Sequence, residues 1–219
     1  MTYKSIIHRY LDPGETLAEV LFGLIMVLTF TLGARLIYPE ESTDGLLIAA
    51  LGCNIAWGII DAFLYLLGCM FERRRLATLL ARLAAESNEE KNLHMVRGEL
   101  SGDLLDLGDP AERDRLYASI AAAAHAAPSP SMRLTADDIK GAVIIFFLVA
   151  LTALPAALPF FLIAEPELAL RTSNVILISL LFLVGYRWGG HVGAPPWLAG
   201  ILIMSLGVAM VLVAIPLGG

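Results

Sequence analysis

Five long apolar runs constrain this chain more than any other feature of its sequence. Each carries at most two charged residues, and they lie at about residues 17–37, 46–70, 140–164, 172–190 and 195–217. A helix of about 20 apolar residues spans the roughly 30 Å hydrocarbon core of a bilayer. The chain is 58% hydrophobic and 16% charged, whereas soluble domains are about 45–50% apolar and about 25% charged. We therefore expect an all-α polytopic membrane protein with five transmembrane helices.

A charged segment separates the second run from the third. Residues 72–138 hold 12 of the 21 acidic and 9 of the 15 basic residues of the chain. The sequence therefore predicts three parts: an N-terminal segment with transmembrane helices 1 and 2 over residues 1–71, a water-exposed helical domain over 72–138, and transmembrane helices 3–5 over 139–219.

Helical spacing recurs inside this charged domain. Four leucines at positions 76, 79, 80 and 83 predict an amphipathic helix that continues out of the second run. Further helices are expected over residues 93–107 and 111–127, separated by Gly-Asp-Pro at 108–110.

Capping residues and prolines mark helix boundaries in the C-terminal part. Thr135 and Asp138 form a capping pattern that predicts a helix start before the third run. Pro196 is suited to the first turn of the fifth helix. Pro155 and Pro159 lie inside the third run, where each removes a backbone hydrogen bond and predicts a kink. A helix broken in this way either lines a cavity or belongs to a moving element. The alternative is a static kink.

The distribution of basic residues predicts the orientation. With the N-terminus in the cytoplasm, 13 of the 15 basic residues lie inside, and Arg35 and Arg171 lie outside. The domain over 72–138 is then cytoplasmic and the C-terminus lies on the far side. The absence of a recognisable targeting segment and the short loops favour a bacterial plasma membrane. The net charge of −6, without a basic stripe, argues against nucleic acid as a partner.

Asp61 is the ionisable residue placed deepest in an apolar run. A charged side chain in the bilayer is costly, so it usually faces a cavity or a partner and indicates function. Asn54 lies seven residues earlier, on the same helical face. The alternative is that both residues only form hydrogen bonds between helices.

Glu19 and Met26 share one face of the first run. A carboxylate near the cytoplasmic mouth and a deeper thioether would together suit a borderline cation that crosses the membrane. The alternatives are that Glu19 stabilises the start of the helix and that Met26 is packing.

Two rows of carboxylates in the cytoplasmic domain are candidate metal ligands. The members of both rows recur at helical spacing: Glu86, Glu90 and His94, then Glu99, Asp103 and Asp106. Oxygen and imidazole ligands accept iron, manganese or zinc. The alternative is that these carboxylates and the basic residues interleaved among them form an ordinary solvent-exposed helix face.

Familiar catalytic motifs are missing. The sequence has no phosphate-binding G-x-x-x-x-G-K-[ST], no H-E-x-x-H, no G-x-S-x-G and no paired C-x-x-C. We therefore do not expect an enzyme.

Three short stretches carry a family resemblance. They are E-V-L-F-G at residues 19–23, A-L-G-C-N-I-A-W-G at 50–58 and L-P-A-A-L-P-F at 154–160. With the layout of five spans and a charged insertion, the chain resembles a distant member of the vacuolar iron transporter family. This resemblance implies export of ferrous iron or manganese from the cytosol in exchange for protons, by a homodimer.

The chain departs from the family pattern at the intramembrane carboxylates. Met26 stands where the resemblance places an aspartate in the first span, and Asp61 lies within a few residues of the place of a glutamate in the second. Transport as a class is therefore better supported than ferrous iron as the substrate.

Two functions follow as expectations. The first is a proton-coupled exporter of divalent cations, with Fe²⁺ or Mn²⁺ as substrate, Glu19, Met26, Asn54 and Asp61 along the path, and no permanently bound cofactor. The second is a membrane scaffold or metal sensor that acts through its cytoplasmic domain without transport. The expected partners are the lipid bilayer, a second copy of the chain and divalent metal ions.

Overall fold

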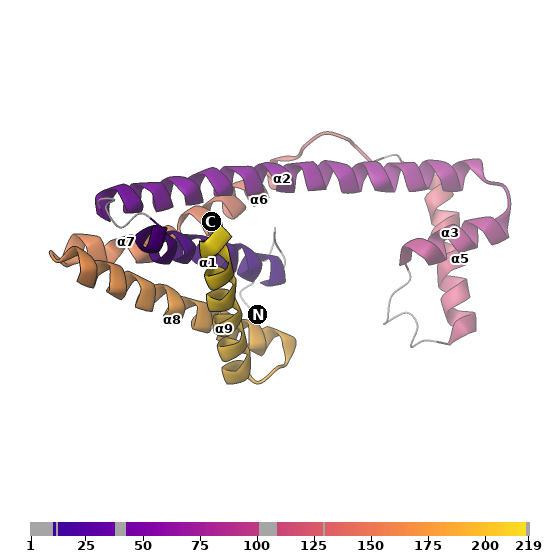
Figure 1. The fold of residues 1–219 in the computed structure, drawn as a ribbon. Coiled ribbons are helices and arrows are strands. Elements are labelled where there is room, and N and C mark those ends of the chain that lie inside the picture. Colours follow the sequence, from indigo (N-terminus) through magenta and orange to yellow (C-terminus); the bar gives the residue numbers. More distant parts are fainter. Residues whose placement is uncertain (1–10, 12, 38–42, 101–108, 129, 218–219) are drawn as a thin grey trace, which may run out of the picture. The chain divides into compact units, whose positions relative to one another are not determined.

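The computed structural model describes residues 11, 13–37, 43–100, 109–128 and 130–217. All regular structure in these residues is helical (Figure 1). Five helical segments are long and apolar enough to cross a membrane, which makes this an integral membrane protein and confirms the all-α class and the number of spans. These spans are Pro13–Gly33, Gly45–Ala85, Ala136–Leu162, Pro166–Val192 and Pro196–Ala214.

The chain divides into two compact units. The membrane unit comprises residues 1–66 and 135–219, and the second unit comprises Leu67–Leu134. The domain expected from the sequence runs over 72–138. Helix α2 (Thr43–Ala85) contributes its first part to the membrane unit and its last part to the second unit.

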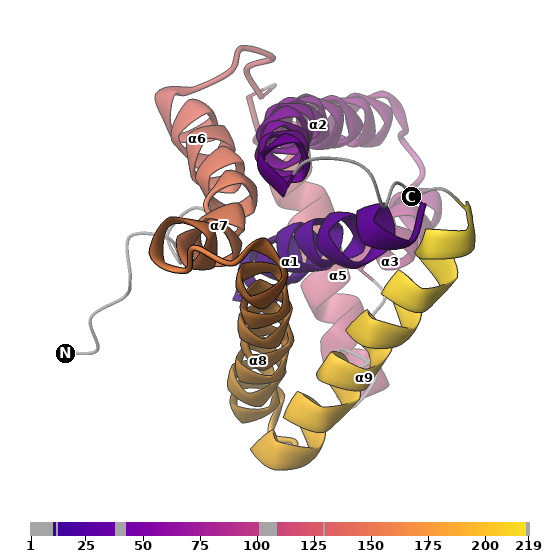
Figure 2. The same ribbon diagram turned by 60° about the vertical axis from the view of Figure 1, so that its left-hand side comes forward.

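Helix α1 (Pro13–Ile37) is the centre of the membrane unit (Figure 2). It packs against α6 (Ala136–Ala150), α8 (Pro166–Val192) and α9 (Pro196–Ala214). Its apolar side chains are buried against residues of α8 and α9. The core formed in this way includes Leu24, Val27, Leu28, Leu177, Leu181 and Val211.

The third span is two helices rather than one. Helix α6 ends at Ala150 and α7 (Ala153–Leu162) follows after Leu151 and Thr152. Pro155 lies in the first turn of α7, where a missing N–H costs little, and Pro159 lies inside α7. The prolines therefore lie on the C-terminal side of a break in the span.

The start of α6 carries the cap expected from the sequence. Thr135 accepts a hydrogen bond from the Asp138 backbone N–H, and the Asp138 carboxylate accepts one from the Thr135 N–H at 2.6 Å. This reciprocal capping box satisfies two backbone donors that a helix start otherwise leaves unpaired.

Helices α8 and α9 form a tight hairpin with the most extensive helix contact in the membrane unit. Gly193 ends α8 at φ 73°, a left-handed conformation that glycine adopts without strain. Pro196 starts α9 three residues later, as expected. Phe182, Tyr186 and Trp197 gather near this turn, with ring centroids 5.3–6.2 Å apart. A 3₁₀ turn over Ile215–Leu217 follows α9.

The second unit has its own apolar core. The end of α2 packs with α3 (Glu89–Leu100) and α5 (Pro110–Ala126). The core residues are Leu83, Val96, Tyr117, Ala121 and Ala124, and Leu79 and Leu80 pack against them. The amphipathic continuation of the second span is therefore confirmed for Leu79, Leu80 and Leu83, whereas Leu76 is exposed. Part of the helix expected over 93–107 lies outside the described residues.

Candidate functional site

A cavity of about 330 Å³ in the membrane unit brings acidic side chains together. Residues of α1, α2 and α6 form most of its wall, and its lining comprises Leu11, Glu15, Ala18, Glu19, Asp61, Leu64, Tyr65 and Ile145. We call this cavity the carboxylate pocket. It unites Glu19 and Asp61, two residues that the sequence places on different spans.

The electrostatics of the carboxylate pocket favour a positive charge. The charges of Asp61 and Glu15 both act on Glu19. One carboxyl oxygen of Asp61, Oδ2, is fully buried and has no hydrogen-bond partner among the described residues. Carboxylates that are withdrawn from water and close to one another are costly unless a proton or a cation joins them. The pocket is therefore suited to take up one or the other.

Asn54 connects helices rather than lining the carboxylate pocket. Its side chain is fully buried, and Nδ2 donates to the carbonyl oxygens of Gly23 and Val149 at 3.3 and 3.2 Å and to Thr152 Oγ1 at 3.0 Å. A Cβ on Gly23 would lie 2.3 Å from Thr152 Oγ1, so only glycine permits this approach. Asn54 thus connects α1, α2 and the break between α6 and α7.

Met26 lines a second cavity of about 320 Å³. The described residues around it are Phe22, Ile25, Met26, Thr29, Phe30, Cys53, Trp57 and Met210. We call it the sulfur pocket. Phe22 and Trp57 contact each other edge to face, with ring centroids 5.6 Å apart. On α1, Phe22 lies between Glu19 and Met26, and on α2, Trp57 lies between Cys53 and Asp61. Glu19 and Met26 therefore line different cavities.

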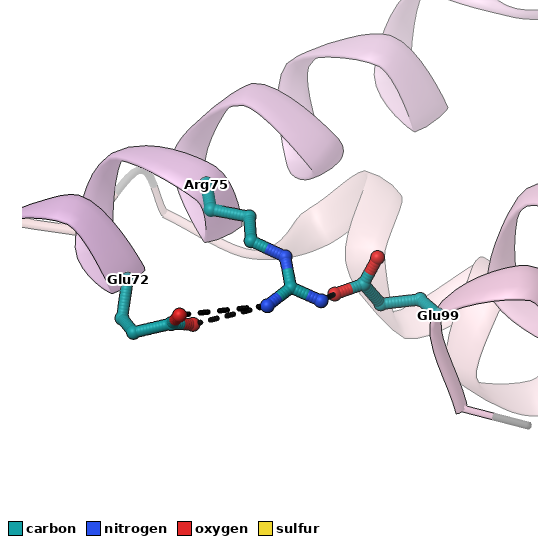
Figure 3. A network of polar contacts seen from close by, with 3 residues as sticks. All are labelled: Glu72, Arg75 and Glu99. Atoms are coloured by element: carbon teal, nitrogen blue, oxygen red, sulfur yellow. Dashed lines mark hydrogen bonds and ion pairs between the residues drawn. The ribbon is translucent and has the colours of Figure 1, made fainter. Parts of the chain in front are cut away.

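Two carboxylates predicted as metal ligands in the second unit contact basic groups. Arg75 forms an ion pair with Glu99 and a second one with Glu72 at 3.4 Å (Figure 3). Glu86 accepts a hydrogen bond from the Asn88 backbone N–H at 3.0 Å and lies 3.6 Å from Lys91. The Asn88 N–H and the Lys91 ammonium hold the pKa of Glu86 below its usual range.

The other predicted ligands of the second unit do not converge with these two in the described residues. Glu90 lines a groove between α3 and α5, and His94 is exposed on α3. Asp103 and Asp106 lie outside the described residues. Within the part of the chain that the structure describes, no three His, Cys, Asp or Glu side chains are arranged to hold a metal ion. The described carboxylates of the carboxylate pocket form no such group either.

Sequence reasoning missed several residues of these sites. Tyr65 lies one turn beyond Asp61 on α2, a spacing that indicates a shared face. Thr152 hydrogen-bonds to Asn54, and Cys53 and Met210 line the sulfur pocket. No local pattern relates these three to their partners, because they come from helices far apart in the chain.

The chain matches no protein-family model, and no curated protein is significantly similar to it.

Proposed function

We propose that this protein is a proton-coupled exporter of divalent cations, with Fe²⁺ or Mn²⁺ as substrate. The observation that carries the proposal is the carboxylate pocket, in which Glu15, Glu19 and Asp61 line one cavity formed by membrane-spanning helices. The resemblance to the vacuolar iron transporter family supports the same class of activity.

Competition for the same carboxylates provides the coupling. A divalent cation and protons each neutralise the repulsion between Glu19 and Asp61, and they exclude each other. A cation that enters from the cytoplasm releases protons, and protons that enter from the far side release the cation. Mn²⁺ and Fe²⁺ accept carboxylate oxygen and water as ligands, so retained water molecules complete the coordination while the ion is in transit.

Flux into proteoliposomes under an imposed pH gradient tests this proposal. The full chain is assayed with Fe²⁺, Mn²⁺, Zn²⁺ and Co²⁺ separately, alongside Asp61→Asn and Glu19→Gln. We expect gradient-driven flux to fall at least about tenfold in both variants, which corresponds to about 1.4 kcal/mol in the barrier. Both substitutions preserve side-chain size, so the amount of folded protein in the membrane should not change.

Asp137→Asn and Glu167→Gln are the matched controls, because these exposed carboxylates form ion pairs with Lys140 and Arg171 outside the pocket. They should transport like the unmodified chain. Unchanged flux in Asp61→Asn and Glu19→Gln would remove the carboxylate pocket from the mechanism. Absence of flux for every metal, from protein shown to be folded, would overturn the proposal of transport.

A scaffold or metal sensor is the second candidate function. It is supported by the separate core of the second unit and by a groove of about 470 Å³ between α3 and α5, lined in part by Glu89, Glu90 and Ala121. The test is amide hydrogen exchange of the full chain with and without Mn²⁺. Protection confined to α3 and α5, in protein that transports no metal, would favour the sensor over the exporter.

A further inference from the structure

We propose that the sulfur pocket is a binding site for a soft monovalent cation, Cu(I) or its analogue Ag(I). The site is separate from the carboxylate pocket, and the proposal does not depend on transport of divalent cations.

Three sulfur side chains from three helices line this one cavity. Met26 belongs to α1, Cys53 to α2 and Met210 to α9, so the fold brings together residues that are far apart in the chain. Cys53 is a free thiol and is half-buried. Thioether and thiolate ligands select Cu(I) over the hard divalent ions.

The remaining lining residues offer no oxygen ligand that would suit a hard ion. Among the described residues around the cavity, Thr29 alone has an oxygen in its side chain, and this hydroxyl donates to the Ile25 carbonyl at 2.9 Å. The others are aliphatic or aromatic. Phe22 and Trp57, which contact each other edge to face, contribute aromatic surface to its wall.

The charge balance also favours a monovalent ion. Binding forms a Cu–S bond to Cys53 and releases the thiol proton to solvent, since the thiolate is the form that binds metal. One thiolate and one Cu(I) together are neutral, and the two thioethers add no charge. A divalent ion in the same cavity would leave one uncompensated positive charge in an apolar environment, which is costly.

Cys69 provides an internal comparison. It is the other cysteine of the chain, is also a half-buried free thiol in α2, and does not line the sulfur pocket. A chain with Cys69→Ser retains only the thiol of the pocket, and a chain with Cys53→Ser retains only the thiol outside it. If the sulfur pocket binds Cu(I) more tightly than a single thiol does, this higher affinity should be found only in the chain that retains Cys53.

The experiment is a competition between the purified full chain in detergent and the Cu(I) chelator bicinchoninate, without oxygen. We expect the Cys69→Ser chain to bind one Cu(I) at least about tenfold more tightly than the Cys53→Ser chain, or about 1.4 kcal/mol. Met26→Leu and Met210→Leu, which approximately conserve volume, should each lower this affinity. Met204→Leu is the control, because Met204 lies on α9 but packs against the core instead.

X-ray absorption at the copper edge provides a second readout that is independent of affinity. Three sulfur neighbours in the Cys69→Ser chain, and fewer after Met26→Leu or Met210→Leu, would support the site. Equal affinities for the two single-thiol chains, or no effect of both methionine substitutions, would overturn it. Glu19→Gln and Asp61→Asn should bind Cu(I) normally, so failure of this proposal and failure of divalent transport give different results.

Discussion

Asn54 shows how one buried amide can position three segments of a membrane bundle. Its two N–H groups point at acceptors on α1 and at the end of α6, and Thr152 itself donates to the Val149 carbonyl at 2.6 Å. Polar groups between helices are useful in a bilayer because lipid offers no alternative partner. The amide therefore holds α1 and α2 in place next to the carboxylate pocket.

We predict that Asn54→Asp lowers the free energy of unfolding by about 1–2 kcal/mol, because a carboxyl offers at most one donor to the three acceptors that the amide contacts. Thermal unfolding in detergent measures the change. Asn88→Asp is the matched control, since Asn88 uses its carbonyl oxygen to accept from Glu90 and Lys91 and an aspartate keeps that role. Equal melting temperatures for both variants would contradict the assignment.

For individual residues, the sequence predicted single positions better than their groupings. Asp61 and Glu19 stand out because a charge in an apolar run is costly, and both line the same pocket. The grouping of Glu19 with Met26 used helical spacing alone. Spacing locates a shared face of α1, but it does not reveal that Phe22 and Trp57 meet across that face. Such contacts depend on tertiary packing, which local periodicity does not encode.

The helix starts are the elements most clearly specified by local chemistry. Both α6 and α9 begin where the sequence predicts, at a capping box and at a proline. The break between α6 and α7 follows from the same local rules, since Pro155 disfavours a continuous helix through the preceding turn.

Replacing the cap of α6 tests its contribution. Thr135→Ala removes the oxygen that accepts from the Asp138 N–H, and we expect it to lower the free energy of unfolding by about 1 kcal/mol. Thr135→Ser retains the oxygen and should be close to neutral. Chemical denaturation of the two variants in the same detergent measures both values. A serine variant as unstable as the alanine variant would show that the methyl group matters, not the cap.

The start of α3 should respond to acid through Glu86. Its lowered pKa means that the folded state favours the carboxylate, so this contribution to stability is present above the ordinary glutamate range and is lost as the pH falls through the folded pKa. We expect the amide resonance of Asn88 to titrate with a midpoint below that of glutamate in an unfolded peptide. Glu86→Gln should abolish this transition. A midpoint at or above the ordinary value would contradict the interaction.

Orientation in the membrane is the property of the complete chain with the clearest experimental consequence. The basic residues predict that the second unit faces the cytoplasm and that the loop before α8 faces outward. Single cysteines at Ser119 on α5 and at Glu167 on α8, in a chain with Cys53→Ser and Cys69→Ser, report the two sides. An impermeant maleimide should label Glu167→Cys in intact cells and Ser119→Cys only after lysis. The reverse pattern would invert the topology.

The central position of α1 also dictates an order of assembly. Helix α1 precedes its neighbours in the chain: α2 follows it directly, whereas α6, α8 and α9 begin only at Ala136, Pro166 and Pro196. The hairpin of α8 and α9 is local in the chain and is able to form as soon as its turn has been inserted. Helix α1 can therefore meet α2 early but acquires α6, α8 and α9 only after most of the chain has been made, and its Thr29 and Thr31 hydroxyls donate to carbonyls of α1 itself.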